Sequence, residues 1–286
     1  MKKVVLAFSG GLDTSYCAIY LAKEMGLEVH AALANTGGFS AEELARIEKR
    51  AYALGVKSYV ALDVTQDYYQ HAIKYMIFGN VLKNSTYPIS VSSERISQAT
   101  AIARYAREIG AYYLCHGSTG AGNDQVRFDM IFNIVAPEIE VIALIREKRL
   151  SREEEIEYLR SHGVDFDFKK AEYSINQGIW GTSVGGKETL TSSETLPEEA
   201  YPSQLKETEP RRVTLTFERG EFVALDGKRY DDRIAAIQAL QAVASRYAVG
   251  RDMHVGDTII GIKGRVGFEA AAPMVIIKAH HMLEKH

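Results

Sequence analysis

The residues best suited to chemistry come at the start of the chain, where residues 7–15 read Ala-Phe-Ser-Gly-Gly-Leu-Asp-Thr-Ser. The hydroxyl groups of Ser9, Thr14 and Ser15 lie beside two adjacent glycines, which let the backbone turn sharply and approach a ligand closely. The free N–H groups at the start of a following helix would face an anion. This stretch therefore predicts a loop that holds a di- or triphosphate.

The segments around this loop are the ones that such a site needs. Residues 4–8 form an unbroken apolar run, as in a central parallel strand covered on both faces. Residues 16–25 are typical of a helix, and Gly26 is placed as its stop. Taken alone, the two glycines are equally consistent with a tight turn whose hydroxyls cap the helix. The full motif resembles the pyrophosphate loop of the N-type ATP pyrophosphatases, and it lacks the Lys-Ser/Thr ending of a Walker A loop and the spacing of a dinucleotide fingerprint.

A second polar stretch, residues 116–129, follows the apolar run 111–115. Its three glycines alternate with hydroxyl, amide, carboxylate and guanidinium groups, which favours a ligand-binding loop, with a solvated turn as the alternative. His116 at its start has two interpretations, a role near phosphate or a hydrogen-bonded structural histidine.

Apolar strands at residues 29–34, 58–64, 111–115 and 140–145 alternate with helical patterns at 66–81 and 92–109 and with two capping boxes, at Ser40 and Ser151. This alternation predicts an α/β fold with a parallel, doubly wound sheet, in which ligands gather at the carboxyl ends of the strands.

From about residue 165 the pattern changes. Residues 173–201 are aperiodic, residues 212–217 and 222–225 predict a hairpin, and residues 232–247 predict a helix. Strands at 258–262 and 274–277 and a helix starting at residue 280 would complete a smaller α+β domain. We therefore predict a nucleotide-binding domain over residues 1–165 and a synthetase or substrate domain over residues 166–286.

Composition limits the classes of function. The 286 residues are 46% hydrophobic and 25% charged, with a net charge of −3, which gives no bulk attraction to nucleic acid or to an anionic membrane. No stretch is long and apolar enough to span a bilayer, and the apolar run that ends at Phe8 is too short for a secretion signal. Cys17 and Cys115 lack metal-ligand spacing and are expected to be buried free thiols, which indicates a cytoplasmic location.

The series formed by SGGLDTS, Leu33-Ala34-Asn35, Tyr87 with Ser92, and HGSTGAGNDQVRF closely resembles the argininosuccinate synthase family over nearly the whole chain. The resemblance implies an adenine nucleotide alpha hydrolase-like sheet followed by the synthetase domain. It also implies an ATP-dependent, AMP-forming C–N ligase of arginine biosynthesis. The ureido oxygen of citrulline attacks the α-phosphorus of MgATP to give an adenylate and pyrophosphate, and the amine of aspartate then displaces AMP.

The resemblance also assigns roles to residues. ATP would be bound by Ala7, Phe8, Ser9, Gly10, Gly11, Leu12, Asp13, Thr14, Ser15, Ala34 and Gly117. Aspartate would be bound by Thr119, Asn123 and Asp124, and citrulline by Tyr87, Ser92, Asn123, Arg127, Ser174 and Ser183. Asp13, Asp124 and Arg127 are the expected catalytic residues. Asp13 would act on the helix dipole or near Mg²⁺, which enters with ATP, and no dedicated metal ligand is expected.

Three positions depart from the family pattern. Ala121 stands where the family usually has Lys, while Gly256 and Phe268 stand where the family has a Glu and a Tyr that contact the amino-acid end of citrulline. The missing carboxylate leaves two hypotheses: the acceptor is a citrulline acylated on its α-nitrogen, or a nearby acid such as Glu269 substitutes. Family members also continue past residue 286 with a C-terminal helix used in subunit packing, so the chain is expected to be truncated. The homo-oligomer that the resemblance implies, a tetramer in the family, is therefore left open.

Two alternatives remain at this stage. One is another N-type ATP pyrophosphatase, such as a tRNA thiolase or lysidine synthetase, which the low net charge disfavours. The other is a non-catalytic nucleotide-binding protein, which the second-substrate loop with Asn123, Asp124 and Arg127 disfavours.

Overall fold

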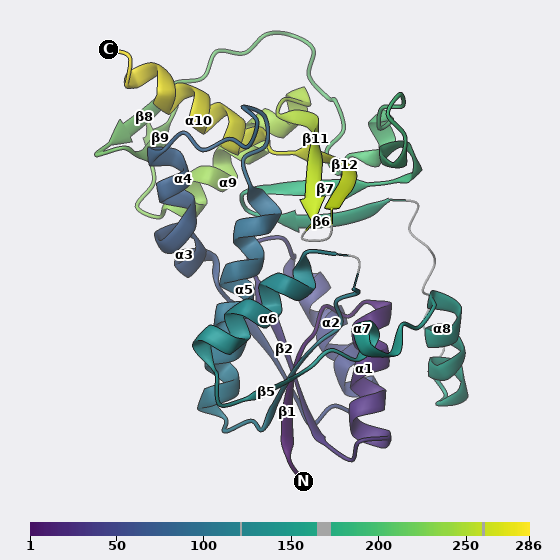
Figure 1. Ribbon diagram of the computed structural model, residues 1–286. Helices are drawn as coiled ribbons and strands as arrows, with labels where there is room; N and C mark the ends of the chain where they lie inside the picture. Colours follow the sequence, from purple (N-terminus) through teal and green to yellow (C-terminus); the bar gives the residue numbers. More distant parts are fainter. Residues whose placement is uncertain (121, 165–172, 259–260) are drawn as a thin grey trace. The chain divides into compact units, whose positions relative to one another are not determined.

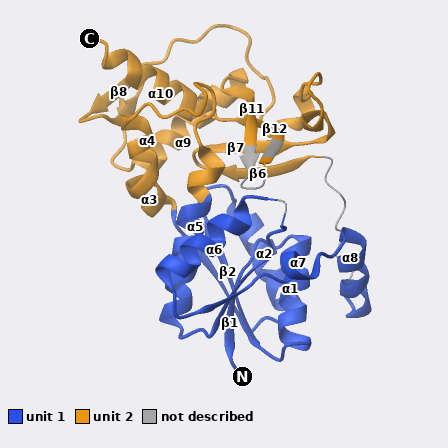
Figure 2. Ribbon diagram, viewed as in Figure 1, with its two compact units in different colours: residues 1–64, 95–170 blue, residues 65–94, 171–286 orange. Residues whose placement is uncertain are grey.

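The computed structural model describes residues 1–120, 122–164, 173–258 and 261–286. The chain forms two compact units, each made of two stretches of sequence: Met1–Val64 with Arg95–Lys170, and Thr65–Glu94 with Ala171–His286 (Figure 2). The division into functional domains at residue 165 stays a prediction.

The first unit is built on a five-stranded sheet in the order β3-β2-β1-β4-β5. Figure 1 labels β1, β2 and β5 of this sheet. All four pairings are parallel, which confirms the predicted α/β class. Its strands are β1 Lys3–Ala7, β2 Glu28–Asn35, β3 Ser58–Asp63, β4 Tyr113–His116 and β5 Glu140–Ile142.

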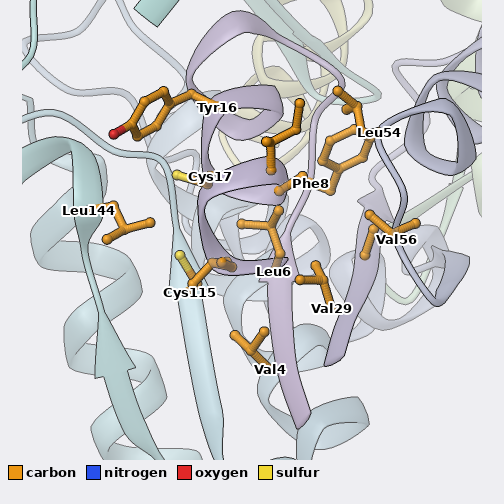
Figure 3. Packing of buried hydrophobic residues seen from close by; sticks show 14 of the residues in the cluster. Val4, Leu6, Phe8, Tyr16, Cys17, Val29, Leu54, Val56, Cys115 and Leu144 are labelled. Atoms are coloured by element: carbon orange, nitrogen blue, oxygen red, sulfur yellow. The ribbon is translucent and has the colours of Figure 1, made fainter. Parts of the chain in front are cut away.

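Helices cover both faces of this sheet because successive side chains of a strand point to opposite sides. Val4 and Leu6 of β1 pack with α1, α2, α7 and α8, whereas Val5 and Ala7 pack with α5 and α6. Figure 3 shows the first of these clusters, with Cys17 on α1 near Cys115 on β4. The helices are α1 Leu12–Lys23, α2 Ala41–Ala53, α5 Ser90–Glu108, α6 Asp124–Val135, α7 Leu144–Lys148 and α8 Arg152–Ser161.

The second unit contains two antiparallel sheets, in the orders β10-β9-β8 and β11-β12-β7-β6. Its strands are β6 Ser174–Gly178, β7 Gly181–Gly185, β8 Leu215–Glu218, β9 Glu221–Leu225, β10 Lys228–Arg229, β11 Arg251–Thr258 and β12 Gly261–Glu269. Its helices are α3 Thr65–Tyr68, a π-helical turn over Tyr69–Ile73, α4 Lys74–Phe78, α9 Arg233–Ala244 and α10 Ala271–Leu283, with short 3₁₀ turns at Lys187–Leu190, Glu198–Ala200 and Ser245–Tyr247. The core of this unit surrounds the fully buried Trp180.

Some predicted elements of the second half are wrong. Residues 274–277 lie inside α10 and are not a strand: Ala272, Ile276 and His280 recur every four residues and are buried, so helical packing outweighs the β-branched composition. The stretch 173–201 is not irregular throughout, since it contains the β6–β7 hairpin. The strand predicted at 140–145 ends at Ile142, and of the strand predicted at 258–262, residues 259–260 lie outside the described residues.

No helix in the described part of the chain is long and apolar enough to cross a membrane.

Candidate active site

The first loop joins the buried end of β1 to α1. Gly10 adopts a left-handed conformation, with φ of +76°, so the turn requires glycine here. The cap residue of α1 is Gly11, which has no side chain to occupy the first N–H groups of the helix. The side chain of the cap residue therefore does not use these groups, which an anion could accept from.

Hydroxyl groups brace the loop from within. The Ser15 hydroxyl donates to the Gly11 carbonyl at 2.7 Å, and Ser15 is fully buried. The oxygens of Ser9 and Thr14 are 3.3 Å apart. Ala7, Phe8 and Leu12 are buried apolar residues, so their side chains belong to the core, and a ligand would meet their backbone.

Arg50 on α2 also supports this loop, and the sequence analysis missed it. Its Nη1 donates to the carbonyl oxygen of Gly10, the glycine of the left-handed turn. Nothing in the helical pattern around Arg50 distinguishes it from the other basic residues of α2. Its role follows only from the packing of α2 beside the end of β1.

The second loop lies directly against the first, because β4 is the neighbour of β1. A Cβ placed on Gly117 would come within 3.1 Å of Thr14 Cγ2 and 3.3 Å of Asp13 Cβ. At these distances a side chain at Gly117 would require Thr14 or Asp13 to shift by a few tenths of an ångström. The two predicted ligand loops are therefore brought together within the first unit.

His116 is a structural histidine, which decides between its two interpretations. Its side chain is buried, its Nδ1 accepts from the Ser118 N–H at 3.2 Å, and its Nε2 donates to Asp129 Oδ1 at 2.9 Å. Burial opposes ionisation of Asp129, but its hydrogen bonds to His116 and Arg146 hold the pKa of that carboxyl below its usual range. Arg146 also donates to Gln125, whose amide donates to the Gly120 carbonyl at 2.6 Å. This chain of contacts fixes the backbone of the second loop.

Asp124 lies between two arginines at the start of α6. Its Oδ2 is 3.1 Å from Arg95 Nε, and its Oδ1 is 2.7 Å from Arg127 Nη1. Burial opposes ionisation, yet Arg95 and Arg127 outweigh it and lower the pKa of Asp124. Asp124 is therefore an anion with two cations held close to it.

Arg95 is a second residue that the sequence analysis missed. Its Nη1 donates to Gln98 at 2.9 Å, and the Gln98 amide is 3.4 Å from Thr36 Oγ1 in the loop after β2. Ala34, a predicted adenosine contact, is buried near the end of the same strand. The loops after β1, β2 and β4 thus all reach one carboxyl edge of the sheet, and Asn123, Arg127 and Thr119 belong to the same region.

The other predicted citrulline residues, Tyr87, Ser92, Ser174 and Ser183, belong to the second unit. Paired residues of antiparallel strands share a face of the sheet, and so do alternate residues along one strand. The register places Ser174 and Ser183 on the same face as Gly256 and Phe268.

An aromatic stack lies against this face. The Tyr87 ring is 4.0 Å from that of His254 and 5.2 Å from that of Phe268. The Tyr87 hydroxyl accepts from the Val91 N–H at 3.0 Å, at the start of α5. Ser92 lies in the first turn of this helix.

Two of the three unusual positions are described. Gly256 is buried, and Phe268 is 1% exposed. Glu269 follows Phe268 directly along β12, so its side chain points to the opposite face of the sheet, where Arg251 Nε binds it at 3.0 Å and the Ser203 hydroxyl at 2.5 Å. This arrangement disfavours the hypothesis that Glu269 substitutes for the missing carboxylate. Ala121 lies outside the described residues.

The parallel sheet and the helix that starts directly after its first strand are typical of nucleotide-binding α/β proteins. Residues 3–165 match the model of the "Arginosuccinate synthase N-terminal HUP domain", and residues 173–286 match the "Arginosuccinate synthase C-terminal domain". The chain belongs to the argininosuccinate synthase family, which confirms the resemblance seen in the sequence.

Curated relatives agree with this assignment. The chain is 37% identical over 286 residues to an argininosuccinate synthase of Dictyoglomus thermophilum, covering 99% of this chain and 71% of that protein. It is 39% identical over 293 residues to that of Xanthomonas campestris pv. campestris, covering 99% and 72%. It is 34% identical over 284 residues to that of Sulfolobus acidocaldarius, again covering 99% and 72%.

Proposed function

We propose that this protein joins aspartate to citrulline, or to a citrulline acylated on its α-nitrogen, and releases AMP and pyrophosphate. Membership of a family of ATP-dependent, AMP-forming ligases supports the reaction class. The observation that carries the proposal is the contact of Gly117 with Thr14, because it sets an ATP loop against a loop rich in carboxylate and amide partners.

The first step forms an adenylate. The ureido oxygen of the acceptor attacks the α-phosphorus of MgATP, and pyrophosphate leaves. The uncapped start of α1 and the hydroxyls of Ser9 and Thr14 would hold the leaving pyrophosphate. Mg²⁺ would enter the site with ATP, as part of the substrate.

In the second step the amine of aspartate attacks the ureido carbon, and AMP leaves. A carboxylate has about four acceptor positions, so Asp124 can receive the substrate ammonium while it stays bound to Arg95 and Arg127. Thr119 and Asn123 would bind the substrate carboxylates, and Arg127 the citrulline. Catalysis would then rest on positioning and on charge stabilisation.

For the acceptor, we favour a citrulline whose α-nitrogen is acylated. An acylated nitrogen carries no positive charge, and the sheet face with Ser174 and Ser183 presents Gly256 and the apolar ring of Phe268. Glu269, the nearby acid, points to the opposite face of this sheet, where it is paired with Arg251. The product would be the corresponding N-acyl argininosuccinate.

We further propose a cytoplasmic homo-oligomer that acts in arginine biosynthesis. Cys17 and Cys115 are free and buried, in keeping with a reducing compartment.

Pyrophosphate release with citrulline, N-acetylcitrulline and N-succinylcitrulline, each with and without aspartate, tests the proposal. AMP formation that requires both aspartate and a citrulline compound is expected, with faster turnover of an N-acyl form. Equal turnover of free citrulline would remove the acceptor proposal alone. ATP binding without turnover of any acceptor would favour a non-catalytic nucleotide-binding protein.

A further inference from the structure

A second acidic side chain lies against the first loop. Glu155, in the first turn of α8, is 3% exposed, and its carboxyl group lies close to that of Asp13 in the first turn of α1. Its Oε2 is buried and has no hydrogen-bond partner among the described residues. None of the catalytic steps proposed above uses Glu155.

Packing fixes this position. The rings of Tyr16 on α1 and Tyr158 on α8 are 4.8 Å apart, and Leu159 is fully buried in the same core cluster. Ser151 and Glu154 form a capping box that sets the first residue of α8. Glu155 therefore cannot turn to solvent without loss of these contacts.

The groups around Glu155 leave its charge poorly compensated. Asp13, Tyr16 and Cys17 face it from α1, and Arg152 faces it from its own helix. Burial raises the pKa of Tyr16 to about 12, while the hydrogen bond to Cys115, with burial, raises that of Cys17, so both stay neutral. Arg152 is the cation that opposes the two carboxylates.

A buried carboxylate oxygen without a donor is costly, and two carboxylates that lie close together repel each other. One shared proton removes both problems, because it neutralises one group and supplies the missing donor. Burial, with the charge of Asp13, raises the pKa of Glu155 to about 8.

We propose that Glu155 is a positioning residue of the phosphate loop, which in its protonated form donates a hydrogen bond to Asp13 and so holds the start of α1 ready for ATP. The inference rests on the proposed binding of ATP at this loop. Loss of the shared proton adds one negative charge beside the site for an anionic ligand. The affinity for MgATP should therefore fall as the pair deprotonates.

Binding of MgATP, measured by calorimetry without amino-acid substrates, tests this. From about pH 7 to about pH 10 the dissociation constant of the unaltered protein should rise by about tenfold. In Glu155→Gln, which keeps a donor but does not titrate, the change should stay below about twofold. Glu153→Gln, at an exposed glutamate of the same helix turn, should behave like the unaltered protein.

Infrared spectra detect the protonated carboxyl group without ATP. They therefore distinguish the absence of the shared proton from the absence of ATP binding at the loop. A protonated-carboxyl band should persist at about pH 7, disappear above about pH 8, and be absent from Glu155→Gln. In Asp13→Asn the band should disappear at lower pH, because the repelling charge is gone. A flat binding profile in the unaltered protein, an equally steep profile in Glu155→Gln, or no carboxyl band at neutral pH would overturn the proposal.

Discussion

Gly117 touches Thr14: a Cβ on Gly117 would come within 3.1 Å of the Thr14 methyl group and 3.3 Å of its backbone nitrogen. The loop after β4 is thereby fixed against the helix start where phosphate would bind.

Gly117→Ala should weaken MgATP binding by about tenfold or more, because the added methyl pushes the two loops apart and small displacements at such sites are costly. Titration calorimetry measures the change. Gly122→Ala is the matched control in the same loop, since its Cβ would meet no atom closer than 3.9 Å. Unchanged binding in Gly117→Ala would show that the two loops can accommodate the added methyl group.

Removal of Arg50 should also weaken MgATP binding by about tenfold, because the Gly10 carbonyl loses a charged donor in the left-handed turn. Arg50→Lys should lose less, since it keeps the charge. Arg46→Ala is the control: its side chain is 77% exposed and lies 3.9 Å from Glu43. Similar effects of Arg46→Ala and Arg50→Ala would point to net charge, and away from the contact with Gly10.

Asp124→Asn should reduce aspartate-dependent AMP formation by about a hundredfold, because the substitution removes the carboxylate between Arg95 and Arg127 that is proposed to bind the amine of aspartate. Pyrophosphate exchange should persist, since it reports the earlier adenylation step. Asp124→Ala should act in the same direction and also disturb Arg127. The two activities are measured separately with labelled pyrophosphate and with AMP detection. If ATP binding were lost as well, Asp124 would belong to the nucleotide site.

The free energy of unfolding should respond to Glu155. Its pKa in the folded protein is raised, to about 8 from about 4.5, so its contribution is fully present below about pH 4.5 and is lost as pH rises through about 8. Glu155→Gln should therefore gain stability relative to the unaltered protein over this interval, by ~1 kcal/mol or more. Urea unfolding at the two ends of the interval measures the gain, and a difference that does not depend on pH would contradict it. Glu153→Gln again serves as control.

The sequence predicted the features that local chemistry determines. Adjacent glycines between an apolar run and a helix predicted the first loop, and strand-helix alternation predicted the parallel sheet, both of which the structure contains. Arg50 and Arg95 were missed because their roles depend on which helix face packs beside a strand end. No local sequence pattern in α2 or α5 indicates which face of the helix packs there.

The second half was harder to predict for a related reason. Strand β6 reads Ser-Ile-Asn-Gln-Gly, with little apolar alternation, and its pairing with β7 depends on a partner supplied by the rest of the sheet. In α10 the apolar run suits either a strand or a helix, and the buried face decides. The face shared by Ser183 and Phe268 follows from strand register, which residue types alone do not give.

The inserted segment Thr65–Glu94 has a consequence for anyone who divides this protein. Helix α5 starts in the second unit and continues into the first, and the segment before it supplies core side chains to the second unit. These are Tyr68, Tyr69, Ile73, Met76 and Ile77. A fragment that ends near residue 165 would contain these five side chains but lack Trp180 and Phe222, which belong to the same core. It would therefore expose an apolar surface that favours aggregation. The two halves of the gene are therefore better expressed as one chain.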